Sequence, residues 1–236
     1  MRSSHIRIAA TCLTVTLVGC GGGSGLGPES VKQKEEELKD DLVTNWDAYE
    51  SGDFNAAIEV FEETLRQADA SEGDASVKRQ VKSEAHNGIG WSFLQGQDLN
   101  SASQAFAQAV NLDRRNTDAW VGWTGVSLAQ RSFTDVIQFA LQALELEPDY
   151  NSGTRGDGDG RLLSHDDIDT NHIRLMLAEA YFQLGFYTAA ERGDPNNAAA
   201  QLKLVRSSFK YQDPGQLLLT LSQVSIELQA GVEGGT

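Results

Sequence analysis

The feature that most constrains the fold of this chain is an internal repeat. Residues 83–116 can be laid over residues 117–150 at a shift of 34 positions, which places Ala109 on Ala143. A fixed period in this range is typical of architectures in which each unit buries its apolar face against its neighbours. Within each copy, apolar residues recur at the spacing of two short amphipathic helices. The repeat therefore predicts an all-α chain of stacked helix pairs.

The second copy has the fuller pattern of small and large apolar residues, namely Trp120, Trp123, Phe133, Ala140, Ala143, Leu144, Leu146 and Pro148. This pattern resembles the tetratricopeptide repeat (TPR) family. The resemblance implies a right-handed α-solenoid of about four helix pairs, followed by a C-terminal capping helix. On the register of the family, the repeats occupy residues 38–71, 83–116, 117–150 and 171–205.

Two irregularities interrupt the period without changing the register. Eleven extra residues separate the first two copies, and we assign them to a loop at 72–74 and a longer following helix. A polar insertion at 151–170 separates the last two copies. In the fourth copy Ala190 occupies the buried position, after which Gly193-Asp194-Pro195 predicts a loop and a helix that resumes at 196 or 197 and runs through 209. In the third copy, Gly122 and Gly125 either weaken its first helix slightly or allow a neighbour to approach closely.

The C-terminal region predicts the capping helix that such arrays need. Asp213-Pro214 is typical of an N-cap followed by proline in the first turn. The helix would cover 216–230, with Leu217, Leu221, Val224 and Leu228 facing inward. Alternating leucines at 217, 219 and 221 leave a strand as the other interpretation. We expect residues 231–236 to be disordered.

The N-terminal segment resembles a bacterial lipoprotein signal peptide. Arg2 and Arg7 precede an apolar stretch at 8–18, which ends in the lipobox-like sequence 17–20, Leu-Val-Gly-Cys. The resemblance implies removal of residues 1–19 and lipidation of Cys20 with acyl groups such as palmitate. The alternative is an ordinary secretory signal with an incidental cysteine. The protein is then expected in the bacterial cell envelope, and glycine at position 21 favours the outer membrane, facing the periplasm. Residues 20–30 form a glycine-rich tether before a helical domain at 31–230.

Charge and cysteine content exclude two classes of function. The chain has 34 Asp and Glu against 19 Lys and Arg, a formal net charge of −15. Nucleic-acid binding needs a basic surface, so no nucleic-acid partner is expected. Cys12 lies in the removed segment and Cys20 becomes a thioether, which excludes thiol chemistry and thiolate metal sites.

The sequence supports neither a metal site nor a catalytic site, and we expect no cofactor. Residues 157–160, Asp-Gly-Asp-Gly, are suggestive of a calcium loop, but an EF-hand needs Gly at position six and Glu at twelve, where Leu162 and Ile168 stand. His165 and His172 are seven residues apart, wider than the usual zinc spacing. No nucleophile, phosphate-loop or dinucleotide motif occurs. Should calcium bind, its ligands would be Asp157, Asp159 and Asp166.

The TPR resemblance also implies a binding groove lined by the first helix of each repeat. Trp46 and Trp91 occupy equivalent positions there and would form an aromatic platform for a peptide or apolar segment. The alternative is that they pack under neighbouring helices, whereas Trp120 and Trp123 match positions between helices and are expected in the core. Carried over by register, the groove positions are Leu42, Trp46 and Tyr49, then Asn87, Trp91 and Leu94, then Val121, Gly125 and Leu128, and finally Leu175, Glu179 and Phe182.

Together these features predict a non-catalytic scaffold that is anchored to the membrane by its lipid and binds a protein partner. Its setting would be an assembly, secretion or export complex of the cell envelope. Two alternatives remain. One is a solute- or glycan-binding lipoprotein of an outer-membrane uptake system, and the other is an enzyme that uses acidic residues of the 151–170 insertion.

Overall fold

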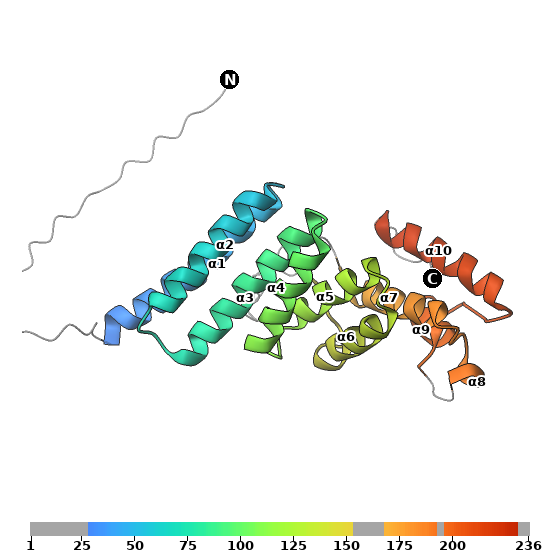
Figure 1. Ribbon diagram of the computed structural model, residues 1–236. Coiled ribbons are helices and arrows are strands. Elements are labelled where there is room, and N and C mark those ends of the chain that lie inside the picture. The colour runs from blue at the N-terminus through green and yellow to red at the C-terminus, as the bar shows by residue number, and fades with distance from the viewer. Residues whose placement is uncertain (1–27, 153–167, 193–195, 231–236) are drawn as a thin grey trace, which may run out of the picture.

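The computed structural model is an elongated series of helices (Figure 1). It describes residues 28–152, 168–192 and 196–230, in which every regular element is a helix. The prediction of an all-α chain is confirmed at this level. In chain order the helices are α1 (Pro28–Glu50), α2 (Phe54–Ala70), α3 (Ala75–Gln95), α4 (Leu99–Leu112), α5 (Thr117–Ala129), α6 (Phe133–Leu146), α7 (Thr170–Gln183), α8 (Ala189–Arg192), α9 (Ala198–Val205) and α10 (Pro214–Gln229).

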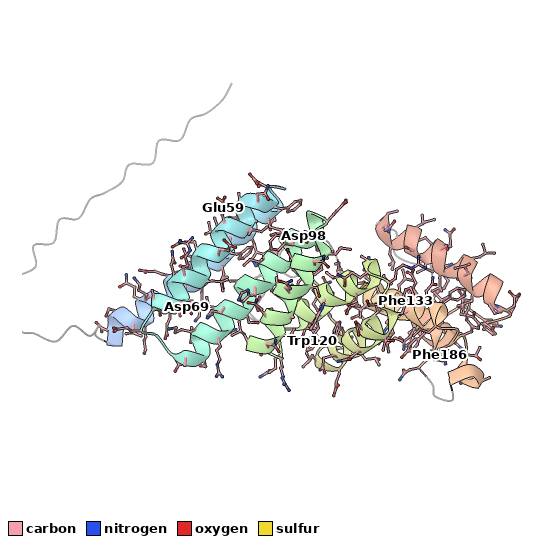
Figure 2. The ribbon with its side chains drawn as sticks, viewed as in Figure 1. Glu59, Asp69, Asp98, Trp120, Phe133 and Phe186 are labelled. Atoms are coloured by element: carbon pink, nitrogen blue, oxygen red, sulfur yellow. The ribbon has the colours of Figure 1, made fainter. Side chains whose placement is uncertain are left out.

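Acidic side chains define the starts of several helices. An Asp53 carboxylate oxygen accepts a hydrogen bond from the Ala56 N–H at 3.0 Å, and Asp98, labelled in Figure 2, accepts one from Ser101 at 3.1 Å. A carboxylate at this position satisfies a free N–H and interacts favourably with the helix dipole. Local sequence therefore sets where α2 and α4 begin.

The helices pack as successive pairs along the array. α1 packs on α2, α3 on α4, α5 on α6 and α7 on α9, and each pair also contacts the next through α2–α3, α4–α5 and α6–α7. The first helices of the pairs contact one another as well, α1 with α3, α3 with α5 and α5 with α7. One continuous apolar core results, running from α1 to α10.

Four equivalent turns preserve the sequence register. Each contains one residue with positive φ, namely Gly52 at 81°, Gln97 at 61°, Arg131 at 61° and Gly185 at 79°. They are separated by 45, 34 and 54 residues, which are the spacings that the two irregularities predicted. Because this backbone region is disfavoured for side chains with a Cβ, its recurrence at Gln97 and Arg131 indicates a turn held by the packing of the helices.

Neighbouring pairs approach each other closely at two glycines. Gly88 on α3 lies against Phe61 of α2, and Gly122 on α5 lies against Phe106 of α4, so the same contact recurs 34 residues apart on the first helices. A Cβ at either glycine would lie less than 3.0 Å from the phenyl ring, and both rings are fully buried. Of the two interpretations given for Gly122 and Gly125, close approach is confirmed at Gly122 but not at Gly125, where an added Cβ would meet Leu94 only at 3.9 Å.

The ends of the 151–170 insertion are held together. Asn151 and Asp169 form an antiparallel bridge. The Ser152 N–H donates to the Ile168 carbonyl at 2.9 Å, and the Thr170 N–H donates to the Tyr150 carbonyl at 3.0 Å. Helix α7 begins at once after this bridge, so α6 and α7 pack as neighbours despite the insertion.

The C-terminal helix is confirmed, and its strand alternative is wrong. Asp213 accepts a hydrogen bond from the Gln216 N–H at 2.9 Å, with Pro214 as the first residue of α10. Leu217, Leu221 and Val224 are buried, and α10 packs on α7 at the end of the array (Figure 1). Leu228 is partly buried against the same core.

Three predicted details are wrong. α1 begins at Pro28, so residues 28–30 are helical rather than part of a tether, because proline and an acidic first turn suit a helix start. Ala190 is exposed on the four-residue α8, and Ala198 on α9 takes the buried position since Asn197 caps a new helix there. That helix ends at Val205 rather than 209.

Other predictions lie outside the described residues: the signal peptide at 1–19, Cys20, most of the insertion with Asp157, Asp159, His165 and Asp166, the loop at 193–195 and the tail at 231–236. Within the part of the chain that the structure describes, no helix combines the length and apolar character needed to cross a membrane.

Candidate functional site

Most of the predicted groove is filled by protein. Trp46 is fully buried and Trp91 is 3% exposed, so neither presents a platform to a partner. The aromatic-platform prediction is wrong, and the packing alternative describes both side chains. Each indole ring packs against the second helix of its own pair instead of facing outward. The other groove residues that are buried are Leu42, Tyr49, Asn87 and Val121.

Trp46 and Trp91 are buried in contacts with other aromatic rings. The Trp46 ring meets Phe61 edge-on at a centroid distance of 5.3 Å and Tyr49 at the same distance. Trp91 meets Phe106 edge-on at 5.6 Å. Edge-to-face pairs at these distances add to the stabilisation from burial. Each tryptophan therefore joins its first helix to the second helix of the same pair.

A buried carboxylate joins the second and third pairs. Asp118 on α5 is 2% exposed and accepts hydrogen bonds from Asn87 Nδ2 at 2.7 Å and Trp91 Nε1 at 2.8 Å, both on α3. The Tyr150 hydroxyl, just after α6, donates to the other carboxylate oxygen. Sequence reasoning missed Asp118 because an acid near a helix start is ordinarily a surface residue. Its donors make it a link between repeats.

Part of the groove remains accessible as an apolar row at the ends of the first helices. Leu94, Leu128 and Phe182 are each half-buried and stand at equivalent positions on α3, α5 and α7. The equivalent residue of α1, Tyr49, is buried, and its hydroxyl accepts a hydrogen bond from Gln95 Nε2 at 3.2 Å. We call Leu94, Leu128 and Phe182 the last-turn row.

Two further groove residues lie on α7. Leu175 is half-buried. Glu179 is exposed to solvent, but partial burial of its carboxyl group raises its pKa, an effect that the nearby positive charge of Arg131 opposes. Gly125 lies opposite Leu94, where an added Cβ would meet Leu94 Cδ2 at 3.9 Å. The accessible surface is thus apolar along the last-turn row and charged beside it.

A second candidate surface is formed by residues expected in the core. Trp120 and Trp123 on α5 are only partly buried and line a pocket of about 430 Å³ with Phe139 of α6. The placement of these tryptophans wholly in the core is therefore wrong, because the side of α5 that carries them is covered only in part by α4 and α6. Figure 2 labels Trp120 beside these helices. The rest of the lining is Val110, Asn111, Arg114, Arg115, Gln138, Gln142 and Leu146.

A pocket of about 530 Å³ lies between α1 and α2. Its lining includes Lys34, Glu37, Asp41 and Gln67, so acidic and basic side chains are mixed within it. No aromatic residue lines it. This composition offers no distinct chemistry to a ligand.

The histidine and carboxylate side chains near the start of α7 serve as a helix cap. His172 Nδ1 lies 2.8 Å from the Asp169 carboxylate and accepts from the Asp169 N–H at 3.2 Å, an arrangement that caps the start of α7. Across residues 28–152, 168–192 and 196–230, no group of three or more His, Cys, Asp and Glu side chains is placed to hold a metal ion.

Two comparisons with known proteins were negative. No protein-family model matches the chain, and a search of curated proteins finds no match either.

Proposed function

We propose that this chain is a non-catalytic interaction scaffold of the bacterial cell envelope, anchored through a lipid on Cys20. Its helix pairs would form a right-handed TPR-type solenoid that binds a protein partner in an assembly, secretion or export complex. The observation that carries the proposal is the last-turn row, Leu94, Leu128 and Phe182, in which the same half-buried apolar position recurs on the first helices of three successive pairs. A regularly spaced apolar row suits a partner segment that crosses several repeats.

The surroundings of the row fit a protein interface. Its apolar side chains stand on helices that are already packed, so few degrees of freedom remain to be lost on binding. Arg131 and Glu179 supply charge beside the row, and Gln130 is exposed at the end of α5. Apolar anchors with a polar border are the usual composition of such surfaces.

Site-specific photo-crosslinking in the producing bacterium tests the scaffold proposal. A photoreactive amino acid replaces Leu94 or Leu128 in the full-length chain, and the matched control replaces Leu219, which is 74% exposed on α10. We expect one discrete protein adduct from 94 and 128 but not from 219, identified by mass spectrometry. Adding Leu128→Glu to the 94 probe should abolish the adduct, because a charge in the apolar contact is costly to desolvate.

Two results would count against the proposal. One is an adduct pattern that is the same at all three positions, which indicates random collision. The other is an adduct from position 94 that persists when Leu128→Glu is present in a chain whose helical circular dichroism is unchanged.

The lipid anchor has its own test. Cells that express the full-length protein are fed labelled palmitate, and the chain is then immunoprecipitated. We expect label in the protein with Cys20 and none in Cys20→Ala, which should also accumulate as the uncleaved precursor. Equal labelling of both proteins would refute attachment at Cys20.

A further inference from the structure

The pocket beside α5 is built on three aromatic rings. The Trp123 and Phe139 rings stack at a centroid distance of 4.1 Å and an interplanar angle of 22°, and the Trp120 ring stacks on Trp123 at 5.7 Å and 20°. Of the four tryptophans in the chain, these are the two that the helices leave partly exposed. Together the rings form an apolar wall on the side of the array formed by α4, α5 and α6.

Hydrogen bonds hold both indole rings in place before any ligand arrives. Trp120 Nε1 donates to the Arg114 carbonyl at 3.0 Å, and Trp123 Nε1 donates to Ser103 Oγ at 3.0 Å. Stacking and these bonds together restrict the side-chain torsions. A ligand that contacts such a wall loses less free energy to side-chain ordering than one that contacts mobile rings.

The border of the pocket is positively charged in a chain that is strongly acidic. Arg114 and Arg115 follow α4, and they are the only charged residues that line the pocket. Both are exposed, and neither guanidinium has an ion-pair partner within the described ranges. Against a net charge of −15, this pair is a local attraction for anions.

We propose that this pocket binds an acidic peptide segment that carries one aromatic or large aliphatic side chain. The apolar side chain packs on Trp120, Trp123 and Phe139, and its flanking carboxylates pair with Arg114 and Arg115. The peptide backbone then forms hydrogen bonds with the side-chain amides that line the pocket, those of Asn111, Gln138 and Gln142. Tryptophan and arginine are the residue types that dominate binding energy at protein interfaces.

This site goes beyond the scaffold proposal because it uses different residues, although both surfaces include part of α5. The last-turn row lies on α3, α5 and α7, whereas the pocket is lined from α4, α5 and α6. A volume of about 430 Å³ lies within the range of ligand pockets, which is about 300–1,000 Å³. It therefore suits one anchoring side chain and its immediate neighbours rather than a whole folded domain.

The test is titration of the isotope-labelled full-length protein with blocked tripeptides, followed through the indole N–H signals in NMR spectra. The probes are acetyl-Asp-Phe-Asp-amide, its Asp-Ala-Asp and Lys-Phe-Lys counterparts, and glucuronic acid as an acidic sugar. We expect the Asp-Phe-Asp peptide to shift the Trp120 and Trp123 signals with a lower Kd than the other probes. The signals of the buried Trp46 and Trp91 serve as internal references.

Charge variants complete the test. In the double variant Arg114→Gln, Arg115→Gln we expect the Kd of the Asp-Phe-Asp peptide to rise about tenfold, as for two exposed ion pairs. The control Lys203→Gln, Lys210→Gln changes net charge equally at exposed sites on and after α9, and its Kd should stay within about twofold of the parent.

Four outcomes overturn the proposal. The first is the absence of any shift at Trp120 and Trp123 with millimolar Asp-Phe-Asp peptide, and the second is equal binding of the Lys-Phe-Lys peptide. The third is an equal Kd for the Asp-Phe-Asp peptide in the two double variants. The fourth is a stronger response to glucuronic acid, which would assign the pocket to acidic sugars. None of these outcomes bears on crosslinking through the last-turn row.

Discussion

Replacing Gly122 by alanine should destabilise the protein, although the same change in an ordinary helix stabilises it. In a helix interior, alanine stabilises the folded state by about 1 kcal/mol relative to glycine. At position 122, however, the added methyl group would lie less than 3.0 Å from the ring of Phe106, which is fully buried. The ring has little room to move away because Gly90 of α3 also lies against it: a Cβ added at Gly90 would be only 2.7 Å from the ring. Overpacking of this kind costs about 1–3 kcal/mol. After the gain in helix propensity is subtracted, we expect a net loss of up to about 2 kcal/mol.

Gly125→Ala is the matched control on the same helix. Its added Cβ would meet Leu94 Cδ2 at 3.9 Å, an ordinary van der Waals distance. This variant should therefore gain about 0.5–1 kcal/mol from helix propensity alone. Urea unfolding of both full-length variants, followed by circular dichroism, measures the difference. In thermal unfolding, each kcal/mol corresponds to about 2–4 °C for a chain of this size.

The reasoning is refuted if Gly122→Ala and Gly125→Ala are stabilised equally, since the contact between α4 and α5 would then have room for a methyl group. A double-mutant cycle sharpens the test. Phe106→Leu alone should lose stability, but combined with Gly122→Ala it should lose less than the sum of the single losses, because the smaller side chain leaves space for the methyl group.

Three further predictions concern pH, the buried carboxylate and the capping helix. Burial, with a smaller contribution from Lys82, lowers the pKa of His86 from 6.5 to about 4. Between these pH values His86 is protonated in the unfolded chain but neutral in the folded chain. The free energy of unfolding is therefore expected to fall by about 1–2 kcal/mol as the pH drops from 6.5 toward 4. In His86→Gln, the urea concentration at the midpoint of unfolding should depend less on pH over this range. Asp118→Ala leaves three buried donors without their acceptor and should cost about 3–5 kcal/mol in urea unfolding, with a smaller loss for Asp118→Asn. Leu217→Ala in α10 should cost about 2–5 kcal/mol and increase hydrogen exchange in α10, whereas Leu219→Ala, at an exposed position, should change neither measurably.

The sequence by itself determined the periodic parts of this protein. The 34-residue period and its two irregularities predict the spacings of 45, 34 and 54 residues that separate Gly52, Gln97, Arg131 and Gly185, because the period of the apolar residues along the chain sets where each helix pair recurs. The Asp213-Pro214 pair likewise predicts the start of α10, since capping is a local interaction. Where a break such as that before α9 removes the local signal, the register alone misplaces the buried residue, as at Ala190.

Only the tertiary structure decided which aromatic side chains are accessible. The repeat pattern assigns a residue to a face of its helix, but whether that face is covered depends on how closely the next pair approaches. That distance is set by contacts between residues far apart in sequence, such as Gly88 with Phe61 and Gly122 with Phe106. Trp46 and Trp91 are buried against Phe61 and Phe106, the rings that these glycines contact, while the side of α5 that carries Trp120 and Trp123 stays partly open. Packing between helices therefore buries Trp46 and Trp91, which the repeat pattern placed in the groove, and leaves Trp120 and Trp123, which it placed in the core, partly exposed.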